Sequence, residues 1–147
     1  MSTESNIAIV RRHIDEAVNQ QKVDVVDELY DPNVTYHDPF TPGGLGHGVE
    51  PMKQFMVATT NAFPDFHFEV EDIFGSGDLV VWRGRATGTH KGDFPGLPAS
   101  GKPINLPMTQ FFRITDGKVR ELWVFTDSML MLMQTGAMPA PQAAPTS

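Results

Sequence analysis

The 147-residue sequence contains no cysteine. Disulfide bonds, thiolate zinc sites and cysteine nucleophiles are therefore excluded. No apolar run approaches the roughly 18–20 residues that a membrane-spanning helix needs. The first ten residues, MSTESNIAIV, lack the basic and apolar regions of a signal peptide. We therefore expect a cytoplasmic protein that does not associate with membranes.

Basic residues are also scarce. Lysine and arginine together number 11 against 18 acidic residues, which gives a net charge of −7. Surfaces that bind nucleic acids need clustered lysine and arginine, and the sequence has no such cluster. We expect no nucleic-acid partner and favour a small, neutral or weakly charged ligand.

The sequence lacks the common signatures of metal, phosphate and hydrolase sites. The five histidines are scattered and form no ligand cluster, and the adjacent His37 and Asp38 point to opposite faces of an extended strand. The glycine-rich GGLGHG (43–48) carries no lysine at its end, as a phosphate loop would. No Gly-x-Ser-x-Gly motif is present. We therefore expect no metal.

The first half of the sequence has helical periodicity. Apolar side chains recur every three or four residues over 6–20, and further helices are predicted over 24–30 and 49–63. Between the last two, residues 33–38 are predicted to form a short strand or strand end. The segment rich in proline and glycine at 39–48 is predicted to be a loop.

The second half alternates between apolar and polar residues, which is typical of strands. The pair Asp116-Gly117 is a strong hairpin signal. Long strands are predicted over 66–74, 79–90, 104–114 and 119–127.

This order of elements predicts an α+β fold, in which a curved antiparallel sheet packs on the N-terminal helices and leaves a conical pocket. Residues 1–136 would form a single domain. The last eleven residues, AMPAPQAAPTS (137–147), have the composition of a disordered tail.

A carboxylate ends the most apolar strand, in ELWVFTD (121–127). Alternation puts Asp127 on the same strand face as Trp123 and Phe125, at the edge of an expected apolar site. Burial there would raise the pKa of the carboxyl group and suit it to proton transfer near neutral pH. The same side chain could instead cap a helix beginning at SMLMLMQ, and the two roles are compatible.

Three other polar residues are candidates for the site. His90 could polarise a carbonyl or shuttle a proton, or it could anchor a loop. Gln110 could donate a hydrogen bond to a bound carbonyl, or it could face solvent. Arg83 could bind an acidic ligand group, or it could pair with Glu69 or Glu71 across a hairpin.

Longer segments carry a family resemblance. GTHKGDFPGLPASGK (88–102) and DGKVRELWVFTDSMLMLMQTG (116–136) are its most specific parts. Over residues 6–136 the sequence resembles the SnoaL-like polyketide cyclases, which have the nuclear transport factor 2-like fold. The resemblance implies a cofactor-independent intramolecular aldol ring closure on an aromatic polyketide ester, and hence a place in antibiotic biosynthesis.

The resemblance also implies roles for single residues. The family's general acid/base falls on Asp127, and its histidine in the GTH segment falls on His90. Gln110 stands where a cyclase of the family has a histidine that lines the pocket, and an amide cannot hand over a proton near neutral pH. Candidate substrate contacts, besides Gln110 and Arg83, are His37, Phe63, Trp123 and Phe125.

Two alternatives to the cyclase remain open at the level of sequence. One is a hydroxylase or epoxide-hydrolase-like enzyme of the same fold, and the other is a non-catalytic small-molecule binding protein, because a fold does not fix a function. The resemblance also implies a homodimer or homotetramer, because proteins of this fold commonly pair through the open side of the sheet, and apolar residues on both faces of the predicted sheet allow such pairing.

Overall fold

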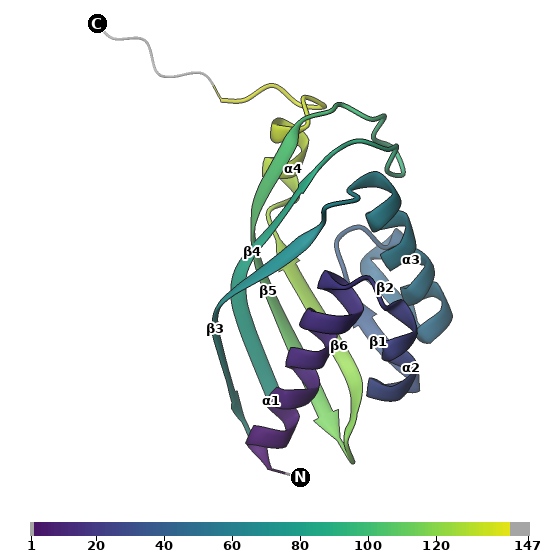
Figure 1. Cartoon of the computed structure of the whole chain (residues 1–147), viewed down its shortest axis with the longest axis vertical. Helices are drawn as coiled ribbons and strands as arrows, with labels where there is room; N and C mark the ends of the chain where they lie inside the picture. Colours follow the sequence, from purple (N-terminus) through teal and green to yellow (C-terminus); the bar gives the residue numbers. More distant parts are fainter. Residues whose placement is uncertain (1, 142–147) are drawn as a thin grey trace, which may run out of the picture.

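A computed structural model describes residues 2–141. One sheet curves around α1, α2 and α3, which lie together on its concave side, and α4 lies near the end of the sheet from which the C-terminal segment leaves (Figure 1). The α+β fold predicted from the sequence is confirmed. Of the predicted tail, residues 142–147 lie outside the described part of the chain.

The helices begin close to their predicted positions. Helix α1 (Thr3–Arg12) starts three residues early because the Ser2 side chain accepts a hydrogen bond from Ser5 N and so caps it. It continues without a break into a π-helical segment, η1 (His13–Asn19). The remaining helical elements are the 3₁₀ turn Val23–Val25, α2 (Val26–Leu29), α3 (Val49–Ala62), the 3₁₀ turn Pro42–Gly44 and α4 (Ser128–Gln134). Within residues 2–141, no helix is long and apolar enough to cross a membrane.

Six strands form the sheet in the order β2-β1-β6-β5-β4-β3. The predicted meander is present as β3 (His67–Ser76), β4 (Leu79–Thr89), β5 (Pro103–Thr115) and β6 (Lys118–Thr126). The first strand, β1 (Tyr30–His37), starts earlier than predicted and runs parallel to β6. The segment expected to be a loop contains a short strand, β2 (Leu45–His47), which pairs with β1.

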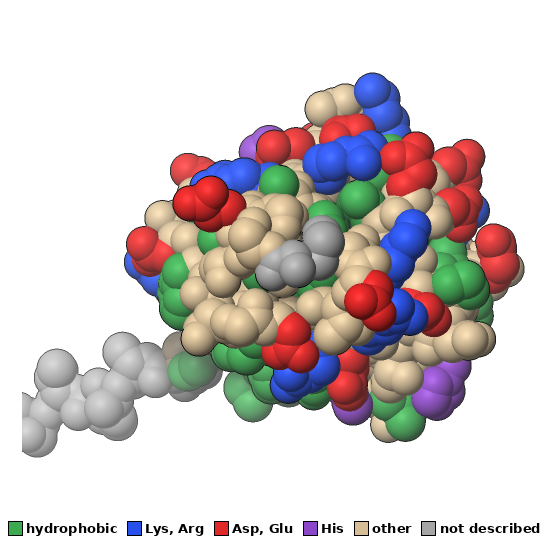
Figure 2. All heavy atoms as spheres, turned by 90° about the horizontal axis from the view of Figure 1, so that it is seen from below, with side chains coloured by type: hydrophobic (Ala, Val, Ile, Leu, Met, Phe, Trp, Pro, Cys, Tyr) green, Lys and Arg blue, Asp and Glu red, His purple; other side chains and the backbone are tan. Residues whose placement is uncertain are grey.

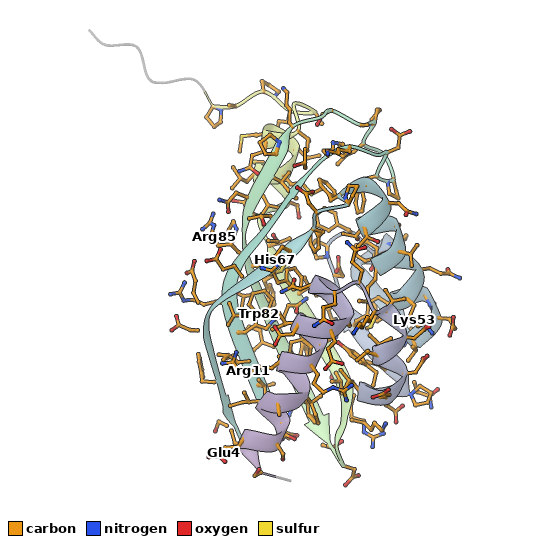
Figure 3. All side chains as sticks on the ribbon, in the orientation of Figure 1. Glu4, Arg11, Lys53, His67, Trp82 and Arg85 are labelled. Carbon is orange, nitrogen blue, oxygen red and sulfur yellow. The ribbon has the colours of Figure 1, made fainter. Side chains whose placement is uncertain are left out.

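The core lies between the concave face of the sheet and the helices. Trp82 and Phe112 from the sheet are fully buried there, together with Val10 and Ile14 from α1 and η1. Figure 3 shows Trp82 between the sheet and the helices, whereas Arg85, from the same strand, lies on the outer side. Alternation along β4 therefore separates a buried face from a solvent-facing one.

A close approach of backbones bends the sheet. A Cβ atom at Gly84 of β4 would overlap the carbonyl oxygen of Glu69 on β3, so only glycine fits there. The register of the two strands shifts nearby, between Val70 and Asp72, as at a β-bulge. Bulges increase twist and curvature, and this one helps the sheet wrap around the helices.

Candidate active site

The helices and the concave face of the sheet enclose a cavity of about 130 Å³. Most of its lining is aromatic or aliphatic. Its apolar side chains include Met52, Phe55 and Met56 from α3 and Phe68, Met108 and Val124 from the sheet. A cavity of this chemistry suits an apolar ligand with a few polar groups.

A row of side chains crosses the floor of this cavity. Strand register places Val124 of β6 opposite Gln110 of β5, and Gln110 opposite Trp82 of β4. Because β1 runs parallel to β6, Asp38, the first residue after β1, continues the row beside Val124. Neighbouring strands lie about 4.8 Å apart, so the backbones at Asp38 and Gln110 are separated by about 10 Å. Asp38, Val124 and Gln110 all line the cavity.

Gln110 has a fixed orientation in this row. Its Oε1 accepts a hydrogen bond of 2.9 Å from Trp82 Nε1. The indole N–H can only donate, so the oxygen of the amide must face Trp82. The two hydrogens on Nε2 are then available to a ligand oxygen in the cavity.

Asp38 is the one acidic residue among the described residues that line the cavity. Burial raises the pKa of its carboxyl group, and a hydrogen bond of 2.8 Å from Phe40 N to Oδ1 acts in the opposite direction. Burial also raises the pKa of Tyr36, a cavity residue on β1, and the charge of Asp38 adds to that shift. Sequence reasoning considered Asp38 only as a metal ligand and missed its place in the cavity.

His13 lines the same cavity from the first residue of η1. A hydrogen bond of 3.1 Å joins its Nδ1 to Tyr30 Oη, and its ring contacts Phe112 edge-on. Burial lowers the pKa of His13 to about 4, so the imidazole is neutral at neutral pH. Sequence reasoning counted this residue among the scattered histidines and gave it no place in a site. His13 lies three residues after the buried Val10 and four before the buried Ala17, so ordinary helical spacing already places it on the buried face.

Phe63 lines the cavity, and the ring of His90 stacks on the Phe63 ring with centroids 5.0 Å apart. His90 is fully buried, its Nδ1 is 2.9 Å from Ser100 Oγ, and its backbone N donates to Lys102 O. These contacts tie down the two ends of the segment between β4 and β5. They favour loop anchoring over direct contact with a ligand, since His90 is not among the cavity-lining residues.

Trp123, Phe125 and His37 lie on the opposite face of the sheet from the cavity. Trp123 stacks on His37 with centroids 5.4 Å apart, and Phe125 is 56% exposed. The cavity side of β6 instead carries Leu122, Val124 and Thr126. Both faces of this strand are rich in apolar residues, so alternation separates the two sets correctly but does not tell which set faces the helices.

Asp127 is the N-cap of α4. Its Oδ1 accepts a hydrogen bond of 2.9 Å from Leu130 N, and the residue is exposed. The capping role expected from the sequence is confirmed. Thr126 lines the cavity, whereas the side chain of Asp127 faces a shallow outer hollow beside Phe125. Its catalytic role stays a prediction.

Arg83 is also on the outer face. It forms ion pairs with Glu71 at 2.6 Å and with Asp72 at 2.7 Å. The expected pairing across the β3–β4 hairpin with Glu71 is confirmed.

Acidic and basic side chains are interspersed over the surface seen in Figure 2, which is inconsistent with a single-sign binding patch on that face.

Within residues 2–141, no group of three or more histidine, aspartate or glutamate side chains is arranged to hold a metal ion. The polar groups of the cavity are thus one carboxyl, one amide, one imidazole and a few hydroxyls. Together they can move a proton and donate hydrogen bonds to a carbonyl oxygen.

The family model for SnoaL-like polyketide cyclases matches residues 8–135. The chain belongs to this family. Two relatives are aklanonic acid methyl ester cyclases: DauD from Streptomyces sp. strain C5 is 32% identical over 78% of this chain and 71% of its own length, and DnrD from Streptomyces peucetius is 32% identical over 82% of each.

Solved structures agree with this SnoaL-like assignment. A SnoaL-like protein from Jannaschia sp. CCS1 superimposes with a TM-score of 0.82 at 29% sequence identity, covering 93% of this chain and 95% of that one. TsrD from Streptomyces laurentii has the same fold, with a TM-score of 0.82 at 22% identity over 94% of this chain and 99% of its own. The nuclear transport factor 2-like architecture expected from the resemblance is therefore present.

Proposed function

We propose that this SnoaL-like protein is a polyketide ester cyclase that closes a ring by an intramolecular aldol reaction. The observation that carries the proposal is the polar row on the floor of an otherwise apolar cavity, with a carboxyl group at one end and an amide donor at the other. The two relatives named as aklanonic acid methyl ester cyclases support it.

Each component of the row has a chemical use in this reaction. A carboxylate in apolar surroundings can remove a proton from a carbon that lies between carbonyl groups. The Nε2 hydrogens of Gln110 can stabilise the negative charge that develops on a carbonyl oxygen. The apolar walls hold the two reacting carbons of one molecule together, which lowers the entropic part of the barrier.

The ligand must also rearrange the cavity. Its volume of about 130 Å³ is below the roughly 300–1,000 Å³ of typical ligand pockets. The unbranched methionines of the lining can change rotamer most readily, and Phe94 reaches the cavity from the segment between β4 and β5. A flat aromatic ester is therefore expected to enter with displacement of that segment.

The experiment is product analysis with aklanonic acid methyl ester as substrate. An intramolecular aldol closure gives an isomer, so chromatography and mass spectrometry should show a new species of unchanged mass that is absent with heat-denatured protein. A gain of one oxygen atom would indicate a hydroxylase, and a gain of water labelled from H₂¹⁸O would indicate a hydrolase. Tight binding without any product would refute the proposal in favour of a binding protein.

A further inference from the structure

We propose that Asp38, rather than Asp127, is the catalytic carboxylate that moves the proton in this cavity. The proposal deepens the proposed function and rests on it. Family resemblance implies this role for Asp127, whereas nothing in the sequence pattern points to Asp38. The two carboxylates differ in their hydrogen bonds and in their position relative to the cavity.

Asp38 is held rigidly at its place in the cavity. Its backbone N donates to Gly44 O at 3.1 Å, its carbonyl oxygen accepts from Thr41 N at 3.1 Å, and its side-chain Oδ1 accepts from Phe40 N at 2.8 Å. The main chain on both sides of the residue is thus fixed, together with one of the two carboxylate oxygens. Within the described residues, no hydrogen bond engages Oδ2, which leaves this oxygen for a ligand proton.

Asp127 has the opposite environment. Its Oδ1 is engaged by Leu130 N, the residue is exposed, and the cavity lining stops at Thr126, one residue earlier. An exposed carboxylate at this position is surrounded by solvent and lies outside the space that a ligand in the cavity would occupy. The partly buried carboxyl of Asp38 has a raised pKa, which brings its acid and base forms closer to balance. General catalysis is most effective when the pKa approaches the working pH.

The position of Asp38 relative to Gln110 fits the shape of a fused-ring ester. About 10 Å separates the two residues along the row, and Val124 lies between them as a small, flat floor. A ligand laid across Val124 could present an acidic carbon to Asp38 and a carbonyl oxygen to Gln110 at the same time. The negative charge that forms on the ligand when Asp38 removes a proton would then spread through the conjugated system to the carbonyl oxygen at Gln110.

The reaction balances with Asp38 alone. The carboxylate takes the proton from the carbon between two carbonyls, and the C–H electron pair becomes an enolate. The enolate carbon attacks a ketone carbon of the same molecule, so that one C–C bond forms and one C=O π bond breaks. The protonated Asp38 returns its proton to the new alkoxide. No oxidant or external base is required, and the carboxylate is regenerated.

Asparagine substitutions test this assignment because they keep the hydrogen bonds. In Asp38→Asn, the amide oxygen still accepts from Phe40 N, and only the titratable group is lost. Asp31→Asn is the control, since Asp31 Oδ1 accepts from Asn33 N two residues further on, as Asp38 Oδ1 accepts from Phe40 N. Asp31 also pairs with Arg120, so this variant loses an ion pair and its ring-closure rate is compared below its own melting temperature. Asp127→Asn is the competing variant and keeps the cap of α4. Equal far-UV circular dichroism and melting curves would show that the variants fold.

Two assays are needed. In the first, ring closure of aklanonic acid methyl ester is expected to fall about 100-fold or more in Asp38→Asn and to stay within a few-fold of wild type in Asp31→Asn. Loss of ring closure in Asp127→Asn together with its persistence in Asp38→Asn would overturn the assignment and leave the proposed cyclase function intact.

The second assay follows proton removal without ring closure. The exchange of the carbon-bound hydrogens of 2-tetralone, a small bicyclic ketone, is measured by NMR in D₂O. Exchange above the buffer rate with wild type, lost in Asp38→Asn, is the expected result. If wild type catalyses this exchange but closes no ring, the cyclase function fails and the role of Asp38 stands. Failure of wild type to accelerate the exchange, or undiminished exchange in Asp38→Asn, would overturn the inference.

Discussion

Protonation of His13 should make the protein unstable in mild acid. The imidazole is 4% exposed, and its neighbours are the hydroxyl of Tyr30 and the ring of Phe112, neither of which carries a negative charge. Burial lowers the pKa of His13 to about 4. In the unfolded chain the pKa returns to about 6.5.

The sign and the size of the effect follow from this difference. Between pH 6.5 and pH 4 the unfolded chain binds a proton that the folded chain does not bind, so stability falls as the pH falls. One pKa unit corresponds to about 1.4 kcal/mol, which gives a total loss of about 3 kcal/mol from this one group. About 2 kcal/mol of it should be lost between pH 7.5 and pH 5.0.

Urea unfolding at several pH values between 7.5 and 5.0 measures the effect. His13→Asn removes the titrating group and keeps a polar atom near the position of Nδ1, so its free energy of unfolding should depend less on pH than that of wild type. His67→Asn is the matched control, because it makes the same substitution at a histidine that is exposed on β3 (Figure 3). Parallel curves for wild type and His13→Asn would refute the reasoning.

Two further substitutions test the construction of the site. Trp82→Phe removes the indole N–H that orients Gln110, and the unpaired amide oxygen should lower the free energy of unfolding by about 1–3 kcal/mol in urea titrations; an unchanged midpoint would contradict the inferred hydrogen bond. Asp127→Ala should destabilise the protein by about 0.5–2 kcal/mol through loss of the α4 cap, whereas Asp127→Asn should change its melting temperature little; equal losses in the two variants would argue against capping.

Local patterns predicted most of the fold. The strands β3 to β6 follow one another and are joined by short turns or a single loop, so alternation and the Asp116-Gly117 turn were sufficient to identify them. The parallel pairing of β1 with β6 joins opposite ends of the chain, and no local pattern encodes it. Strand β2 is three residues long, and its pairing with β1 stabilises it in a stretch that otherwise has loop composition.

The site was only partly predictable for the same reason. Gln110 and Phe63 were expected to contact a ligand, and both line the cavity. Trp123 and Phe125 lie on the outer face, where Trp123 stacks on His37 and Phe125 contacts Phe111 edge-on. Asp38 joins the cavity through the pairing of β1 with β6, so its placement could be recognised only once that long-range pairing was known.

This parallel pairing also has a consequence for how the protein is made. Strand β1 emerges early in synthesis, whereas β6, its partner, is among the last elements to leave the ribosome. The floor of the cavity therefore cannot assemble until β6 has been synthesised. Asp38 comes to lie beside Val124 and Gln110 only when nearly the whole chain is available. Contacts of such long sequence separation slow folding. Ligand binding then reports completion of the fold, because the full row exists only in the finished molecule.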